Sequence, residues 1–376
     1  MWLLVVLLFW GNRIASGDPV FYRSKVIPLE SLEKQPGEFE ITDDKGKNIR
    51  VDLLLHKDNG GIYWYRRLLT EVCLTGECRP IDIGIYWTGN GKYLGIEVFG
   101  ENLTKTDHSD FSEFDYRKLE AMLKDEWSPL REFLFDELVD PKKDGVDATT
   151  GATKKVIADA SVKDAVYTTY TMWHLIHVGE DEQLALLTYR YLKENAPALS
   201  AFLRHDEPEY VTFLLEGVTS GNLPVSPGAV SVVLKALKHP DPSLRNFAFR
   251  AINLLPLASR DVQDELAPIY KEWAIQDKNR FLQSAAGLET LHESLYSVLA
   301  SDLGEKNAWF LSALIPVLAA SKIQSAEVVK KIKELEKSGD PQLKNPARKF
   351  LQHIGRKSEV GSRKSEIGDR KSENKE

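Results

Sequence analysis

The chain has 376 residues, of which 43% are hydrophobic and 28% charged, and its formal net charge is −7. This length exceeds that of one ordinary domain and predicts two or three, with a sizeable core. The acidic balance disfavours a general nucleic-acid-binding role, which would require a basic surface.

An apolar run of signal-peptide length begins the chain. Residues 2–10 are too few to span a membrane, and Ala15-Ser16-Gly17 supplies small residues for cleavage before Asp18. A basic segment ahead of the run is missing, so a retained anchor stays open as an alternative. We expect residues 1–17 to be a signal peptide and the mature protein to lie outside the cytoplasm, in the periplasm.

Strand signals follow in the next part of the chain. Residues 18–60 alternate in places between apolar and polar side chains and contain Gly, Pro and Asp breaks, which predicts short strands and loops. The clearest signal comes later, where residues 81–87 alternate, Gly89-Asn90-Gly91 makes a turn and residues 93–99 run back. This pattern predicts a β-hairpin with a glycine-rich loop.

Two cysteines, Cys73 and Cys78, precede the hairpin. In an exported chain, a pair this close predicts a disulfide that closes a small turn around Gly76. The loop is short, so we expect only about 2 kcal/mol of stabilisation. A redox-active dithiol is the alternative, although the spacing differs from that of thioredoxin-like motifs, and a metal site would need more ligands.

Helical signals begin after residue 112. Ser112 and Asp115 can form a capping box for a helix over 113–124, and Ser128-Pro129 begins a further short helix. In the loop before them, His108 could deliver a proton to a neighbouring group. A loop stabilised by side-chain caps explains that histidine more simply.

An acidic loop then leads to Asp147-Ala148-Thr149-Thr150-Gly151-Ala152-Thr153, followed by Lys154-Lys155 and by apolar residues at helical spacing through about residue 178. The spacing predicts a loop that enters a helix, with Thr149 or Thr150 as its cap. A helix N-terminus presents free N–H groups to which a phosphate could bind. From the spacing alone, a capped helix with nothing bound is the simpler explanation.

The same stretch resembles the flavinylation motif of FMN-binding domains, which occur in subunits of sodium-pumping quinone reductases and in related exported electron carriers. In that family, a flavin transferase joins FMN through a phosphoester to the last threonine of the motif. The resemblance implies that Thr153 is the acceptor. The surrounding motif then consists of Asp147, Thr150, Gly151 and Ala152.

The resemblance also implies an α+β FMN-binding-like domain over residues 18–178, in which the hairpin forms a sheet behind the flavin. Lys154 or Lys155 could neutralise phosphate charge, although such lysines are more often solvated. The flavin ring would need an aromatic or apolar wall, and the candidates on the hairpin and the motif helix are Tyr86, Trp87, Tyr93, Tyr167, Tyr170 and Trp173.

Two histidines on the motif helix invite a further interpretation. His174 and His177 lie three residues apart on one helix face and could begin a metal or haem site. No further ligand is evident in the sequence, so packing or surface roles explain them better.

Beyond residue 178 the strand signals end and an all-α domain is expected over 179–354. Asp241-Pro242-Ser243-Leu244-Arg245-Asn246-Phe247-Ala248 aligns with Asp340-Pro341-Gln342-Leu343-Lys344-Asn345-Pro346-Ala347, and in both a helix begins at Asp-Pro. The repetition resembles HEAT repeats, and an irregular helical bundle is the alternative. Helices are expected at 181–194, 197–204, 208–217, 228–238, 243–255, 261–275, 279–300, 306–320 and 325–337, with a last one ending near 353.

The last residues, 355–376, repeat a charged heptad that contains few hydrophobic residues, and we expect this tail to be disordered.

These expectations combine into one favoured function, an exported electron-transfer flavoprotein that carries FMN on Thr153. It would be a redox carrier rather than a turnover enzyme. A flavin transferase would mature it, and it would exchange electrons with a soluble or membrane-associated redox protein. The alternative is an extracytoplasmic interaction scaffold in which the FMN-binding-like domain is structural and unmodified. A flavin enzyme with a small substrate of its own is the third option.

Overall fold

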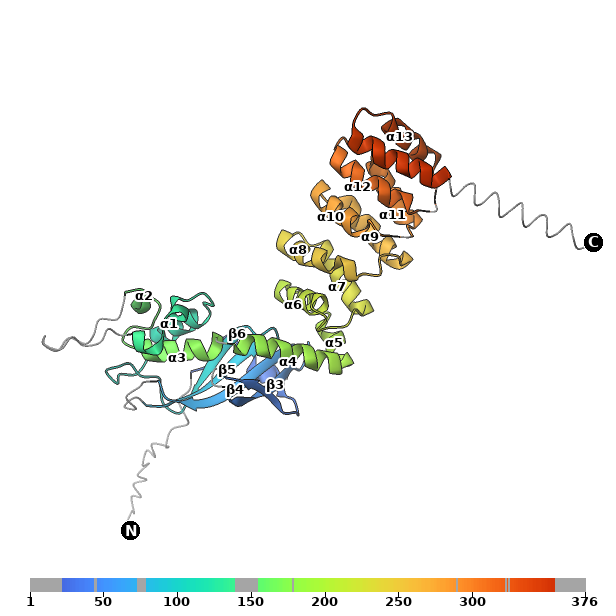
Figure 1. Ribbon diagram of the computed structural model, residues 1–376. Coiled ribbons are helices and arrows are strands. Elements are labelled where there is room, and N and C mark those ends of the chain that lie inside the picture. Colours follow the sequence, from blue (N-terminus) through green and yellow to red (C-terminus); the bar gives the residue numbers. More distant parts are fainter. Residues whose placement is uncertain are drawn as a thin grey trace, which may run out of the picture. The chain divides into compact units, whose positions relative to one another are not determined.

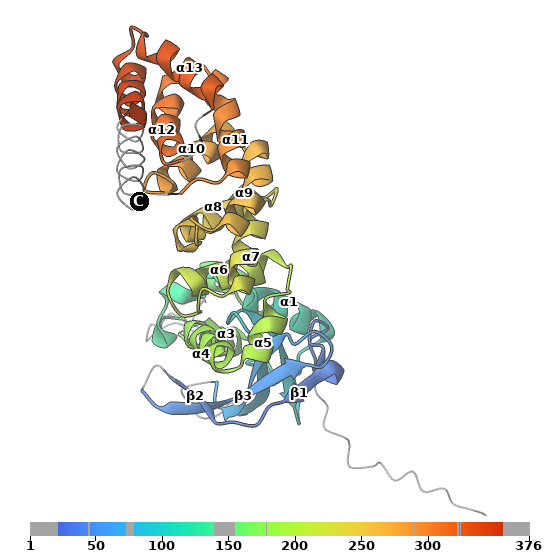
Figure 2. The ribbon, with the colours of Figure 1, turned by 90° about the vertical axis from the view of Figure 1, so that its right-hand side faces the viewer.

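The structure, a computed structural model, describes residues 22–43, 46–72, 79–138, 155–177, 179–288, 290–321, 323 and 325–355. The chain divides into two compact units between Phe202 and Leu203. The first unit combines a curled β-sheet with helices, and the second is helical throughout its described residues (Figures 1 and 2). The predicted order, an α+β part followed by an all-α part, is therefore confirmed.

Four predictions concern residues outside this described part of the chain. They are the signal peptide 1–17, the disulfide between Cys73 and Cys78, the flavinylation motif 147–153 and, apart from its first residue, the tail 355–376. All four stay predictions.

The sheet of the first unit is antiparallel and has six strands. The strand order is β1-β3-β4-β5-β6, and β2 pairs with the other end of β3 on the same edge as β1. The predicted hairpin is confirmed as β5 and β6, which pair antiparallel. The strand bounds are β1 Leu32–Lys34, β2 Phe39–Thr42, β3 Asn48–His56, β4 Ile62–Thr70, β5 Ile81–Thr88 and β6 Tyr93–Phe99.

One face of the sheet is apolar and packs against helices. Trp64 on β4 lies opposite Trp87 on β5, and neither is exposed to solvent. The indole N–H of Trp64 donates to Thr188 Oγ1 at 2.8 Å, and that of Trp87 donates to the Ile176 carbonyl at 3.4 Å. Each buried side chain of this size contributes about 1.5–3 kcal/mol, so these two tryptophans fix the helices onto the sheet.

The helix after the polar segment forms as the sequence predicts. It is α1, Glu113–Leu123, and Ser112 and Asp115 form the expected capping box. The predicted helix from Ser128-Pro129 forms only as two 3-10 turns, η2 at Pro129–Glu132 and η3 at Phe135–Glu137.

The predicted continuous helix from 156 to 178 is wrong. The structure has a short α2, Lys155–Asp159, and a separate α3, Val166–His177. Between them Asp164 adopts a left-handed backbone with φ of 59°, and its carbonyl accepts the backbone N–H of Thr106 at 2.7 Å. The carbonyl of Asp164 is thus bonded outside the helix, and the positive φ interrupts helical geometry.

The boundary between the units differs from the expected one at residue 178. Two more helices, α4 at Glu180–Glu194 and α5 at Ala196–Phe202, belong to the first unit. The Gln183 side chain bonds Thr42 twice, accepting from its N–H at 2.7 Å and donating to its carbonyl at 2.8 Å. These bonds attach α4 to the edge strand β2.

In the second unit, helices pack mainly on neighbours one or two places along the chain, such as α6 on α7 and α8, or α9 on α11. The predicted single helix over 279–300 is wrong, because two helices, α10 and α11, occupy this region. A further helix covers 341–355. The bounds are α6 Pro208–Thr219, α7 Pro227–Leu237, α8 Pro242–Ala251, α9 Arg260–Glu272, α10 Ile275–Ser284, α11 Glu293–Ser301, α12 Ala308–Ala319 and α13 Ala326–Glu336.

The two Asp-Pro helix starts are alike in three dimensions. Asp241 accepts the Ser243 N–H at 2.8 Å, and Asp340 accepts the Gln342 N–H at 2.8 Å. About two helical turns further on, Ala248 and its counterpart Ala347 are fully buried. The prediction that a helix begins at each Asp-Pro is confirmed. No helix within the described part of the chain is both long and apolar enough to cross a membrane.

Candidate functional site

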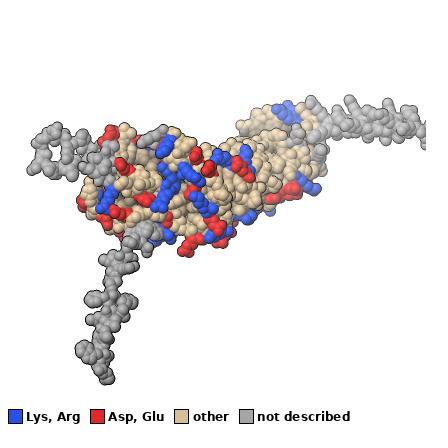
Figure 3. Space-filling model, turned by 90° about the horizontal axis from the view of Figure 1, so that it is seen from below, with Lys and Arg blue, Asp and Glu red and all other residues tan. Residues whose placement is uncertain are grey.

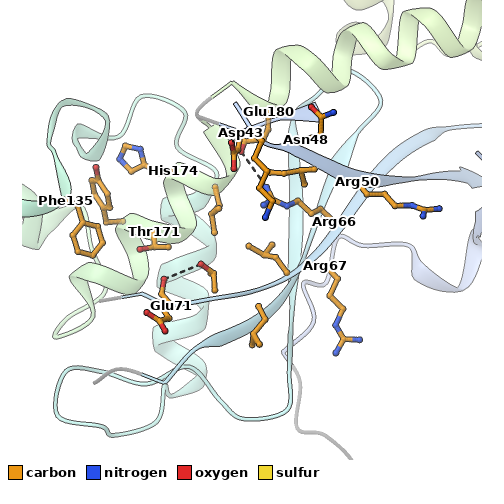
Figure 4. A pocket seen from close by; sticks show the side chains of 17 residues that line it. Asp43, Asn48, Arg50, Arg66, Arg67, Glu71, Phe135, Thr171, His174 and Glu180 are labelled. Carbon is orange, nitrogen blue, oxygen red and sulfur yellow. Dashed lines mark hydrogen bonds and ion pairs between the residues drawn. The ribbon is translucent and has the colours of Figure 1, made fainter. Parts of the chain in front are cut away.

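A cavity of about 810 Å³ opens in the first unit where the ends of β3 and β4 approach α3 (Figure 4). We call it the Arg66 pocket. Its size falls within the range of cavities that hold small molecules and cofactors. Its walls include Lys47, Arg66, Leu68, Phe135, Tyr170 and Glu180.

The alternation of β4 places Arg66, one of the basic residues that line this pocket. Side chains on a strand point to opposite faces in turn, so Arg66 shares the face of Trp64, while Arg67 points to the other face. Arg67 is bound there by Asp82, at 3.0 and 2.8 Å from its Nε and Nη2. In Figure 4 Arg66 points toward Asp43 and Glu180, whereas Arg67 points away.

Arg66 forms a buried ion pair with Glu180, the first residue of α4. Arg66 Nη1 lies 3.7 Å from Glu180 Oε1, and the two side chains are 11% and 6% exposed. Burial lowers the pKa of the Arg66 guanidinium, against the opposing effect of Glu180 and Asp43, yet arginine stays charged in proteins. Among the described residues, Arg66 Nη1 has no hydrogen-bond acceptor.

The opposite wall of the pocket is aromatic. The Phe135 ring stacks on Tyr167 with centroids 5.1 Å apart, and it meets Tyr170 edge-on at 5.6 Å. The Tyr170 hydroxyl donates to the Phe133 carbonyl at 2.8 Å, which fixes the ring. Next to it, His174 contacts Tyr170 at a centroid distance of 3.9 Å. A planar ring could rest against this wall.

Of the six predicted wall residues, the structure places Tyr170 in the pocket and Tyr167 behind Phe135. Trp87 and Trp173 are core residues, and the indole of Trp173 donates to the Asp125 carbonyl at 2.8 Å. Tyr86 lies on the other face of the sheet, where its hydroxyl donates to Glu97 at 3.0 Å. Burial raises the pKa of Tyr93 well above its usual value.

The histidines have packing roles. Nε2 of His174 lies 3.2 Å from the Leu130 carbonyl, and Nε2 of His177 lies 2.7 Å from the Leu123 carbonyl, so each ring N–H donates to backbone. Burial also lowers the pKa of His177, which favours the neutral ring. No group of three or more His, Cys, Asp or Glu side chains suited to a metal ion occurs among the described residues.

His108 lies in a hydrogen-bonded loop, as the simpler interpretation has it. Lys105 N–H donates to the Ser109 carbonyl, and the Ser109 hydroxyl donates to Asp107 at 2.6 Å. The histidine itself has φ of 62° and is exposed.

Arg66, Phe135 and Glu180 are among the pocket residues that the sequence analysis did not single out. The alternation of β4 carries a signal for Arg66, because it puts this residue on the face of the buried Trp64. No comparable local signal exists for Glu180, which reaches the pocket through the packing of α4.

The segment that carries the predicted motif is anchored at both ends in the first unit. The described chain stops at Leu138 and resumes at Lys155, and η2 packs against α2. Leu138 and Ile157 are fully buried. Leu138 directly follows η3, and η2 contacts α3 as well as α2.

Outside the pocket, the cations of the sheet are mostly paired. Lys34 Nζ lies 2.6 Å from Asp52, and Lys57 lies 3.6 Å from Glu33. On the face shown in Figure 3, basic side chains gather in a band near the middle, and acidic side chains lie on either side of it. Comparison of this chain with protein-family models, with characterised proteins and with solved structures finds no match, so the motif and the pocket carry the functional argument.

Proposed function

We propose that this protein is an exported electron carrier whose FMN is joined through a phosphoester to Thr153, with the flavin ring in the Arg66 pocket. The observation that carries the proposal is the position of the pocket: Phe135 in its wall lies three residues before Leu138, the last described residue ahead of the motif, and η2 contacts both α2 and α3. Thr153 precedes Lys155, the first residue of α2, by two positions, a reach of at most about 7 Å of extended chain.

The pocket also suits an isoalloxazine ring chemically. Phe135 and Tyr170 offer an aromatic wall, and Arg66 Nη1 offers a donor that has no acceptor among the described residues. A flavin has an apolar ring edge and an edge rich in acceptor atoms, which match these two walls. When bound, FMN supplies the electron-transfer chemistry, while the protein binds and orients it.

Covalent attachment has a physical reason outside the cytoplasm. A cofactor lost by diffusion there is diluted away, whereas a phosphoester retains it. We propose accordingly that residues 1–17 direct export and that a flavin transferase loads the protein.

The second unit is proposed to be a HEAT-like array that binds the redox partner. Its helices pack on their near neighbours in the sequence, and two capped Asp-Pro starts repeat. Such arrays present extended surfaces that suit protein partners. This feature also favours the alternative function, an extracytoplasmic scaffold in which the first unit carries no flavin.

Intact mass spectrometry separates the two. We would express the chain with a flavin transferase and FAD, and compare it with the variants Thr153→Ala and Thr149→Ala. The unaltered chain and Thr149→Ala should gain the mass of one FMN, because position 149 is not specified in the motif, and Thr153→Ala should not. An unmodified wild-type chain, or equal added mass on Thr153→Ala, would reject covalent FMN at Thr153.

A second measurement separates a carrier from an enzyme. The loaded protein should be reduced by a chemical donor and reoxidised by a redox protein, without turning over a small substrate. Catalytic turnover of such a substrate would favour the enzyme instead.

A further inference from the structure

We infer that Arg66 and Glu180 together set the reduction potential of the flavin, Arg66 by favouring the reduced ring and Glu180 by limiting that effect. The inference rests on the proposed function and concerns the same pocket.

Arg66 is a cation that water screens only weakly. Its side chain is 11% exposed, and it borders a cavity whose far wall is aromatic. Charges in such surroundings act more strongly and over longer distances than charges at an open surface. A ring that gains negative charge in this cavity would therefore be stabilised by Arg66.

The guanidinium of Arg66 can also donate a hydrogen bond, which depends on the direction of its N–H groups. Nη1 is buried and, among the described residues, has no hydrogen-bond acceptor. Buried donors are nearly always satisfied in native proteins, so this N–H suits a ligand with acceptor atoms. The pyrimidine edge of a flavin carries such atoms, and its negative charge increases on reduction.

Glu180 acts in the opposite direction. Its carboxylate lies 3.7 Å from Arg66 Nη1 and is 6% exposed, so it cancels part of the field that Arg66 exerts in the cavity. It lies in the first turn of α4, at the positive end of the helix dipole. Removing this carboxylate should leave the effect of Arg66 stronger.

The test is a redox titration of the full-length, FMN-loaded chain. A chemical reductant supplies two electrons, and the solvent supplies the protons, so that the oxidised flavin becomes the two-electron-reduced flavin. For a two-electron couple, a tenfold change in the equilibrium constant corresponds to about 30 mV.

Two variants should shift the titration in opposite directions. Arg66→Gln should disfavour the reduced flavin by about tenfold, and Glu180→Gln should favour it by a similar factor. Arg66→Lys keeps the charge and should restore most of the wild-type potential. If Arg66→Gln fails to fold, the opposite shift in Glu180→Gln still tests the inference.

Lys57→Gln is the matched control, because it removes one positive charge from a lysine that pairs with Glu33 at 3.6 Å and is not among the residues that line the pocket. It should change the equilibrium less than threefold. The mass of every variant is measured as well. Full FMN loading with equal potentials in all variants would overturn the inference alone, whereas absence of FMN from the unaltered chain would overturn the proposed function and the inference with it.

Discussion

Arg66 Nη1 lies 3.7 Å from Glu180 Oε1, and the two side chains are only 11% and 6% exposed. One comes from the middle of the sheet and the other from the start of α4, so the ion pair ties the helix to the strand. An ion pair in this position is costly to break one partner at a time, because the remaining charge stays buried.

Substitutions in this pair should be strongly non-additive. We expect Arg66→Met and Glu180→Leu each to lower the free energy of unfolding by about 3 kcal/mol, while the double variant loses less than either alone. Urea unfolding of the chain without flavin measures all three. Losses that simply add in the double variant would show that the pair does not act as a unit.

A second prediction concerns the extent of the first unit. A fragment of residues 18–202 should fold cooperatively, whereas a fragment of 18–178 should not, because it loses α4 and exposes Trp64. The indole of Trp64 is fully buried and bonds Thr188 of α4. Thermal unfolding followed by near-ultraviolet circular dichroism distinguishes the two fragments, and a cooperative transition in the shorter one would contradict the boundary at Phe202.

Features that depend on nearby residues were predictable from the sequence. The hairpin β5–β6 follows from alternation and a glycine turn, and the capping box at Ser112 joins residues three apart. The repeated caps at Asp241 and Asp340 are equally local. In each case the stabilising bond lies within the window in which the pattern is read.

Features that depend on distant residues were not predictable. The break between α2 and α3 involves a hydrogen bond from Thr106 to Asp164. The packing of α4 on the edge strand β2 involves a hydrogen bond from Gln183 to Thr42. The two residues of each pair are far apart in the sequence, and no periodic pattern in the sequence indicates that they are in contact. Only part of the Arg66 pocket was predictable from the sequence. The alternation of β4 indicates the face on which Arg66 lies, but the position of Glu180 depends on the packing of α4 against the sheet.

The two Asp-Pro caps of the second unit offer a third prediction. We expect Asp241→Ala and Asp340→Ala each to cost about 1 kcal/mol, since each removes the acceptor of one free backbone N–H at a helix start. Asp261→Ala is the matched control, because Asp261 lies in the first turn of α9 but is not its N-cap, and it should cost only a few tenths. Urea unfolding measures the three, and unequal losses at the two caps would argue against equivalent repeats.

A fourth prediction concerns acid and the capping box of α1. Burial alone would raise the pKa of the Asp115 carboxyl, but hydrogen bonds from Ser112 and the ammonium of Lys105, 2.9 Å away, outweigh it and lower the pKa to about 2. The folded-state pKa thus lies below the ordinary value of 3.8. The ionised group therefore stabilises the fold above that ordinary value, and the contribution is lost as the pH falls toward 2.

Asp115→Asn should accordingly destabilise the protein by about 1–2 kcal/mol at pH 6, because the asparagine loses the charge that Lys105 and Ser112 bind. The difference from wild type should shrink as the pH falls from 4 toward 2, since Asp115 itself then becomes protonated. Urea unfolding at several pH values measures this convergence. Glu113→Gln is the control, because that exposed carboxylate in the same turn pairs with Arg117 at the surface and should change stability by a few tenths at most. A destabilisation by Asp115→Asn that stays constant from pH 6 to pH 2 would show that packing, and not the bound charge, explains its effect.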